Sequence, residues 1–449
     1  LAAVVMTRAP LQFQFPSEGE RDHFRTLYYR EGPLATTKVY ADPRSGEKYM
    51  SVDGIVIGGT GNTEFKQLLL AHLPKLLVQD YSSELSVGLG SGILVGESAL
   101  HGGVERITSV EIEPSVIAGA AYFSDENHRV LERPDVDIVA DDIGNFLRTT
   151  TGRYRVITAD EKTADEYASN GFSYSLDYYD LLRGHLAPGG LLMQWVPATL
   201  PPRQFRLVLN TFASSFPHVQ LWYFMPAHRR GPFNALLVGA LEEIEIDPAR
   251  MDRRLAAQTG AFASLEPYGL TSAMAILPHF VAADELLRDA VRDAGLNSLD
   301  FPRYEFFYPW DYAMGQANHM VANHSFLFDL KRNAHSRFAA GLDLEPSQRD
   351  RFNQTLRAEF LYLARFHGFL TGMAPEEVHR VFDTTLAMAP WNDSLRARIY
   401  AQYAYIASTR HDPRERARLA ACTLARTHAR THARMHARTH VHMHAPGPA

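Results

Sequence analysis

Short apolar segments alternate with amphipathic segments from residue 84 to residue 238. Apolar segments typical of buried strands lie at 85–87, 104–110, 136–140, 155–159, 191–196, 219–224 and 235–238. Segments with the periodicity of helices lie between them, at 93–100, 114–123, 145–149, 174–186 and 204–216. This alternation predicts a doubly wound, Rossmann-like α/β sheet of parallel strands. Ligands of such sheets bind beyond the carboxyl ends of the strands, where the strand order reverses.

Other patterns flank this central part. Residues 22–62 contain β-rich segments around turns such as Asp53-Gly54, and residues 64–77 have helical periodicity. The chain after the sheet is mostly helical in pattern, and 359–407 resembles tetratricopeptide-type helix pairs. We therefore expect five parts: an N-terminal β-strand unit (22–62), a Rossmann-like domain (63–240), a helical and aromatic extension (241–335), a C-terminal helical region (336–423) and a tail (424–449).

The tail repeats a four-residue unit. His428, His432, His436 and His440 recur at every fourth position, which would place them on one helix face, where imidazoles can bind a metal ion. The repeated unit Thr-His-Ala-Arg is also what the tetranucleotide ACGC encodes when it is repeated. We therefore interpret residues from about 424 onward as a low-complexity, repeat-derived tail without a core, and not as a metal site.

Composition narrows the classes of function. The 449 residues include 45 basic and 51 acidic side chains, which gives a net charge of −6. Without the four arginines of the tail, the net charge of the rest of the chain is near −10. This gives no electrostatic reason to expect nucleic-acid binding, and it suits a cationic ligand. The single cysteine, Cys422, excludes a disulfide framework and cysteine-built metal sites. No apolar run approaches the roughly 18 residues of a membrane span, so we expect a cytoplasmic protein, or, given the Leu1 start, the soluble part of a truncated membrane protein.

Candidate chemistry lies at the ends of four predicted strands. Gly88-Leu89-Gly90-Ser91-Gly92 forms a glycine loop between a strand and a helix, which lets the backbone approach a ligand closely. Glu111 ends the next strand, where a carboxylate can accept ribose hydroxyls. Asp142 and Asp160 end the third and fourth strands. Each acid alone could be a solvated strand end or a helix N-cap, but together they predict a nucleoside pocket.

The sequence from about 31 to 225 resembles the spermidine synthase (polyamine aminopropyltransferase) family. It is most similar to the soluble domain of the long, membrane-fused bacterial type. The matching stretches are Glu31-Gly32-Pro33, Ser51-Val52-Asp53-Gly54, Ala71-His72-Leu73-Pro74, Val87–Gly92, Val110-Glu111-Ile112-Glu113-Pro114, Tyr122-Phe123, Leu186-Ala187-Pro188-Gly189-Gly190, and Asn297–Pro302 with Glu305.

The resemblance implies a class I S-adenosylmethionine-type sheet and a site for decarboxylated S-adenosylmethionine. By analogy, Glu111 would bind the ribose, Asp142 the adenine, and Asp160 would act as general base toward a small amine or polyamine acceptor. The remaining residues carried over as donor contacts are Gly88, Gly90, Ser91, Gly92 and Gln67. The resemblance also implies a homo-oligomer that assembles through the N-terminal strands, and no metal.

Departures from the family pattern lie around the amine site. Ser91 replaces a loop aspartate that binds the aminopropyl nitrogen, and Lys66 replaces a tyrosine, so a cation stands where a polyamine should bind. Asp165 and Gln194 are further candidates for contact with the substrate. Two alternatives therefore stay open: a methyltransferase that uses S-adenosylmethionine itself, and a degenerate module that binds a nucleoside or a partner without catalysis.

Overall fold

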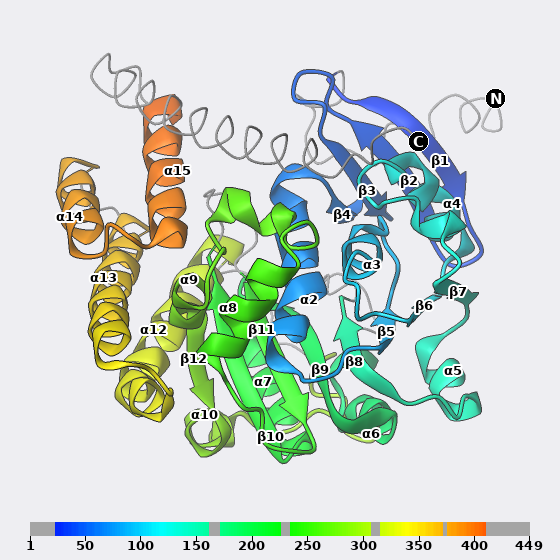
Figure 1. Ribbon diagram of the computed structural model, residues 1–449. Coiled ribbons are helices and arrows are strands. Elements are labelled where there is room, and N and C mark those ends of the chain that lie inside the picture. The colour runs from blue at the N-terminus through cyan, green and yellow to red at the C-terminus, as the bar shows by residue number, and fades with distance from the viewer. Residues whose placement is uncertain (1–22, 161–170, 226–233, 307–314, 371–374, 410–449) are drawn as a thin grey trace, which may run out of the picture.

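The computed structural model describes residues 23–160, 171–225, 234–306, 315–370 and 375–409. A central sheet contains β5 (Ser83–Val87), β6 (Arg106–Glu111), β7 (Val136–Ala140), β8 (Tyr154–Ala159), β9 (Leu186–Pro197), β10 (His218–Phe224), β11 (Asn234–Ala240) and β12 (Phe280–Ala283). Their order across the sheet is β12-β10-β11-β9-β8-β5-β6-β7 (Figure 1). The strands from β7 to β9 are parallel, whereas β11 is antiparallel to both β9 and β10. The predicted Rossmann-like fold is confirmed, but the expectation that all its strands are parallel is wrong for β11 and β12, which are antiparallel to their neighbours.

The strand order reverses between β5 and β8. From β5 the chain adds β6 and β7 on one side, and it then returns to add β8 and β9 on the other side. The carboxyl ends of β5 and β8 are therefore adjacent, and Val87 of β5 pairs with Ala159 of β8. This is the position at which doubly wound sheets bind ligands.

Helices cover both faces of the sheet, and a separate apolar core lies on each face. One face is covered by α2 (Glu64–Leu77), α3 (Ile93–Ser98), α4 (Pro114–Ala120), α8 (Pro248–Ala257) and α9 (Ala273–Ile276). The other is covered by α5 (Ile143–Thr149), α6 (Leu176–Gly184), α7 (Pro202–Ser215) and α10 (Asp284–Val291). Both faces are hidden from water at β9, β10 and β11, which explains why these strands are almost continuously apolar in sequence.

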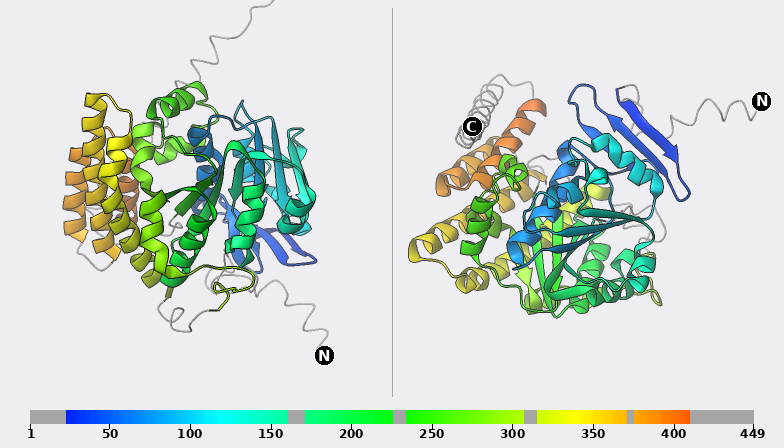
Figure 2. Two further views of the ribbon diagram at one scale, coloured as in Figure 1. Left: turned by 90° about the horizontal axis from the view of Figure 1, so that it is seen from below. Right: turned by 45° about the vertical axis from the view of Figure 1, so that its right-hand side comes forward.

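The N-terminal unit is an antiparallel sheet of β1 (Arg25–Glu31), β2 (Thr36–Ala41), β3 (Lys48–Val52) and β4 (Ile55–Gly59). Asp53 and Gly54 both have positive φ, 49° and 84°, so the alternating segment around them is a tight hairpin. Val39 and Met50 pack toward α4 and join the core on the α2 face. This sheet and the C-terminal helices lie at opposite ends of the molecule (Figure 2).

The C-terminal part consists of α12 (Gly315–Gly341), α13 (Pro346–Leu370), α14 (Pro375–Met388) and α15 (Asp393–Thr409). α14 begins at Pro375, and a turn at Pro390 and Trp391 separates it from α15. The extension before them is not only helical, because β12 pairs with β10 and adds an edge strand to the central sheet. Its sequence, Phe-Val-Ala-Ala, is too short and too uniformly apolar to show the period of a strand.

Candidate active site at the switch point

The glycine loop after β5 makes a tight turn, and one side of it packs against neighbouring side chains. Gly88, Gly90 and Gly92 have φ angles of 85°, 55° and 79°, in the region that favours glycine. A Cβ at Gly92 would collide with Val130 and Asn127, whereas a Cβ at Gly90 would meet nothing within 4 Å. The loop is therefore packed behind Gly92 and faces open space at Gly90, where a ligand can approach the backbone.

Glu111 fixes this loop. Its carboxylate is 8% exposed and accepts three backbone hydrogen bonds, from Leu89 N (3.0 Å) and Gly90 N (3.4 Å) on Oε2 and from Glu113 N (3.1 Å) on Oε1. Burial raises the pKa of Glu111, although the three N–H groups oppose that shift. A carboxylate has about four acceptor positions, so about one is left for a ribose hydroxyl, where two were expected.

Asp142 lies where the sequence predicts, beyond the end of β7. Its Oδ1 accepts the N–H of Asn145 at 2.9 Å, so Asp142 is the N-cap of α5. The neighbouring Asp141 accepts the side-chain amide of Asn145, also at 2.9 Å. Asp142 thus has a structural role at this helix start, and its contact with adenine stays a prediction.

Gln67 and Ser91 meet, which joins α2 to the glycine loop. The Ser91 hydroxyl donates to Gln67 Oε1 at 2.7 Å, and Gln67 Nε2 donates to the carbonyls of Gly59 and Thr63, both at 3.1 Å. Both side chains are buried. The point at which the resemblance implies a loop carboxylate therefore holds two neutral groups that satisfy each other.

Lys66 forms an ion pair with Asp160. The Lys66 ammonium contacts Asp160 Oδ1 and lies 4.3 Å from the centre of the Trp195 ring. The side chains of Lys66 and Asp160 are only 8% and 13% exposed, so water screens the pair weakly. Asp160 and Trp195 therefore form a cation site, and the protein's own lysine fills it.

Gln194, which is also predicted to contact the substrate, does not join this group. Gln194 is 1% exposed, and its amide accepts from the Tyr179 hydroxyl (2.7 Å) and donates to the Ser173 carbonyl (3.1 Å). It is therefore held in the core and not presented to a ligand. Asp165 lies outside the described residues.

Two residues of the segment from Asn297 to Glu305 hold the chain that leads into α6. The Asn297 amide donates to the carbonyls of Gly171 (2.7 Å) and Tyr174 (3.0 Å), and Glu305 Oε1 accepts the N–H of Gly171 at 2.6 Å. This role was not predicted, although the segment is part of the family resemblance. Hydrogen bonds from a side chain to backbone groups far away in the sequence leave no pattern in the sequence, so they could not be predicted from it.

Comparison with known proteins identifies the central domain. Residues 64–228 match the family model of the spermine/spermidine synthase domain. This segment is a spermine/spermidine synthase domain. The resemblance inferred from the glycine loop and the strand-end acids is thereby confirmed, and the domain contains Lys66, the glycine loop, Glu111, Asp142 and Asp160.

Known relatives of the spermine/spermidine synthase domain share about a quarter of its residues. The chain is 28% identical over 190 residues to polyamine aminopropyltransferase 1 of Pseudomonas aeruginosa, covering 42% of this chain and 65% of that protein. It is 29% identical over 189 residues to the spermidine synthase of Dictyostelium discoideum, covering 41% and 66%. The chain thus spans just under two thirds of the length of these relatives. A solved spermidine synthase, in complex with the transition-state analogue AdoDATO, superposes with a TM-score of 0.46 at 20% identity, covering 53% of this chain and 85% of the other.

The spermine/spermidine synthase domain presents an open glycine loop, a buried acid that fixes it, and a carboxylate paired with an ammonium. Within the described residues, no group of three or more histidine, cysteine or acidic side chains is arranged to hold a metal ion. In the same part of the chain, no helix is both long and apolar enough to cross a bilayer.

Proposed function

We propose that this protein transfers an aminopropyl group from decarboxylated S-adenosylmethionine to an amine acceptor, with Asp160 as general base. The observation that supports this most is the position of the glycine loop and Asp160. They follow the neighbouring strands β5 and β8, where the strand order reverses, within a spermine/spermidine synthase domain. A nucleoside bound over Gly90 would bring its sulfonium toward the Asp160 carboxylate.

The reaction requires an unprotonated acceptor nitrogen. This nitrogen attacks the carbon next to the sulfonium, so that a C–N bond forms, the C–S bond breaks and the sulfur leaves as a neutral thioether. Lys66 contacts Asp160 Oδ1, which leaves Oδ2 to accept the proton of the amine. Because the sulfonium is a good leaving group, positioning and proton removal would supply most of the catalysis.

Lys66 restricts the acceptor. At about 4 Å, two unit charges repel by about 4 kcal/mol at an effective dielectric of about 20, so an ammonium is disfavoured beside Lys66. The Lys66–Asp160 ion pair has no net negative charge with which to attract a polycation. We infer that the acceptor presents one amine to Asp160, and that polyamines bind more weakly than they would if Lys66 were neutral.

A methyltransferase that uses S-adenosylmethionine is the second candidate, and the same residues favour it. Ser91 and Gln67 form a neutral pair where a carboxylate would repel the methionine carboxylate of that donor. The Lys66 ammonium could attract the same carboxylate. The two candidates therefore differ in the donor and not in the nucleoside pocket.

Calorimetry and product analysis distinguish the two candidates. We expect the protein to bind decarboxylated S-adenosylmethionine at least about tenfold more tightly than S-adenosylmethionine, and to produce an amine that is one aminopropyl unit longer. Asp160→Asn should lower turnover by about 100-fold or more, with donor affinity within about twofold. Asp180→Asn is a matched control, because Asp180 is 61% exposed on α6.

Three results would contradict the proposal in different ways. Full turnover in Asp160→Asn would remove Asp160 from the mechanism. Tighter binding of S-adenosylmethionine, with a methylated product, would make the protein a methyltransferase. If no nucleoside binds at all, the domain is a degenerate module.

A further inference from the structure

A second cavity lies away from the glycine loop. It has a volume of about 860 Å³ and lies between the start of α7, the end of α10 with η8 (Arg292–Ala294), and the chain from Asp300 to Phe306. Its size is in the range of small-molecule sites, about 300–1,000 Å³. Neither Lys66, the glycine loop, Glu111 nor Asp160 lines this cavity.

The floor of the cavity contains a buried amide without a partner. Gln204 is 2% exposed, and both its Oε1 and Nε2 atoms lack a hydrogen bond within the described residues. Leu207 and Val291, both buried, form the apolar floor beside it. Leaving a buried amide unpaired is unfavourable, so a ligand that pairs with it removes that cost.

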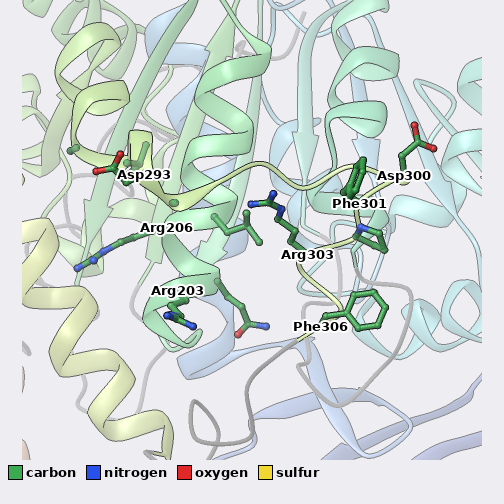
Figure 3. Close-up of a pocket in the computed structure, with 13 residues that line it drawn as sticks. Arg203, Arg206, Asp293, Asp300, Phe301, Arg303 and Phe306 are labelled. Atoms are coloured by element: carbon green, nitrogen blue, oxygen red, sulfur yellow. The ribbon is translucent and has the colours of Figure 1, made fainter.

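The rim of the cavity is cationic and aromatic. In Figure 3 the Arg303 guanidinium points from the chain on one side toward α7, where Arg203 lies on the other side, and Phe306 lines the cavity farther along the chain of Arg303. The Arg303 guanidinium has no carboxylate partner among the residues that the structure describes. Phe301 and Phe306 are 69% and 76% exposed, which is unusual for large aromatic side chains.

The two aspartates that line the cavity do not neutralise the positive charge of its inner rim. Asp300 and Asp293 line the cavity at its two ends, away from the Arg303 guanidinium (Figure 3). Arg206 turns from the cavity and places its guanidinium 4.8 Å from the ring centre of Phe326. The inner rim therefore favours an anion next to a flat ring.

From this arrangement we propose that the cavity binds a purine mononucleotide. The primary amide of Gln204 offers a donor and an acceptor side by side, which match the N6 and N7 edge of adenine. The ring would lie over Leu207 and against Phe306, with its phosphate at the Arg303 guanidinium on the rim. This site is separate from the proposed donor site, and it does not depend on the proposed function.

Titration calorimetry with AMP tests the site while methylthioadenosine saturates the glycine loop. We expect AMP to bind more tightly than adenosine or inorganic phosphate alone, because base and phosphate contact different residues. Gln204→Leu and Arg303→Met should each weaken AMP binding by about tenfold or more. Gln204→Leu should also raise the thermal midpoint of the free protein, since it removes an unpaired buried amide. Arg253→Met on α8, where Arg253 is 70% exposed, should leave binding unchanged.

The rim variant Phe306→Ser avoids the risk of misfolding, because Phe306 is mostly exposed. It should also weaken AMP binding. The proposal is overturned if AMP gives no heat at about 1 mM, if the variants bind AMP as the parent does, or if phosphate alone binds equally well. The proposal also fails if methylthioadenosine displaces AMP, because both would then share the glycine-loop site. Since AMP binding does not require turnover, failure here leaves the proposed transferase activity untouched.

Discussion

Glu64, the first residue of α2, makes the stability of the protein depend on pH. Burial, together with the nearby carboxylates of Glu97, Glu126 and Glu47, raises the pKa of Glu64 to about 7, although the N–H of Gly61 opposes them. In the unfolded chain this carboxyl would titrate near 4.5. Between these two pKa values the unfolded chain loses the proton while the folded protein keeps it.

We therefore expect stability to fall as the pH rises from 4.5 to about 7 and to level off above that. Glu64→Gln removes this loss, so the variant should gain up to about 3 kcal/mol relative to the parent above pH 7 and little at pH 4.5. Urea unfolding of both proteins at the two pH values measures the difference. Glu132→Gln, at an exposed position, should show no such change. If the free energies of unfolding of the parent and of Glu64→Gln differ by the same amount at both pH values, the pKa of Glu64 is not raised by folding.

The sequence located the acids of the site but not their partners. Glu111, Asp142 and Asp160 could be predicted because each follows an apolar strand, and parallel strands place such ends on one edge. The ion pair of Lys66 with Asp160, under the Trp195 ring, was not predicted, although the resemblance placed both residues at the same amine site. Under the proposed function, these unpredicted contacts restrict the acceptor.

At the scale of elements, one buried ion pair joins α13 to α15. Arg398 binds Glu359 through two hydrogen bonds of 2.8 and 2.6 Å, and their side chains are 4% and 3% exposed. Burial alone would raise the pKa of Glu359, but the Arg398 guanidinium outweighs burial and holds it at about 2. The Arg398 guanidinium also lies 4.8 Å from the ring centre of Tyr362.

Arg398→Met should lower the free energy of unfolding by about 3–5 kcal/mol, because it leaves the Glu359 carboxylate buried and unpaired. The double variant Arg398→Met/Glu359→Gln should recover most of this loss, since no buried charge remains. Arg332→Met is the matched control, because its partner Asp329 is on the same helix and both are more than half exposed; it should cost less than about 1 kcal/mol. Equal losses for Arg398→Met and Arg332→Met, measured by chemical denaturation, would contradict this interpretation.

The elements of the sheet could be predicted well because most of them have a clear period and a clear end. The hairpin around Asp53-Gly54 has a turn that only a few residue pairs form, and α5 begins at an acidic N-cap. The edge strand β12 lacks both signals. It forms because Phe280 and Val281 complete the sheet next to β10, which is a tertiary effect.

At the scale of the whole molecule, the C-terminal helices complete both cores of the central sheet. Leu327, Leu330 and Tyr362 belong to the core on one face, whereas Leu342 and Phe352 belong to the core on the other. At the junction, the Phe280 and Phe338 rings stack with their centres 3.9 Å apart. The Lys331 ammonium is buried there and donates to the Phe280 carbonyl at 2.9 Å.

A chain that ends after residue 345, before α13, should therefore be far less stable than the full chain. It would expose Phe328 and Phe338, whose rings pack against Phe360 and Phe352 of α13, and full burial of a side chain of this kind contributes about 1.5–3 kcal/mol. We expect its thermal midpoint to fall by about 10 °C or more, or the protein to be insoluble. A chain that ends after residue 423, which lacks only the predicted tail, should keep the midpoint of the full chain. If instead the chain that ends after residue 345 unfolds at the same temperature as the full chain and still binds methylthioadenosine, the two cores are stable without the last three helices, which then form an independent unit.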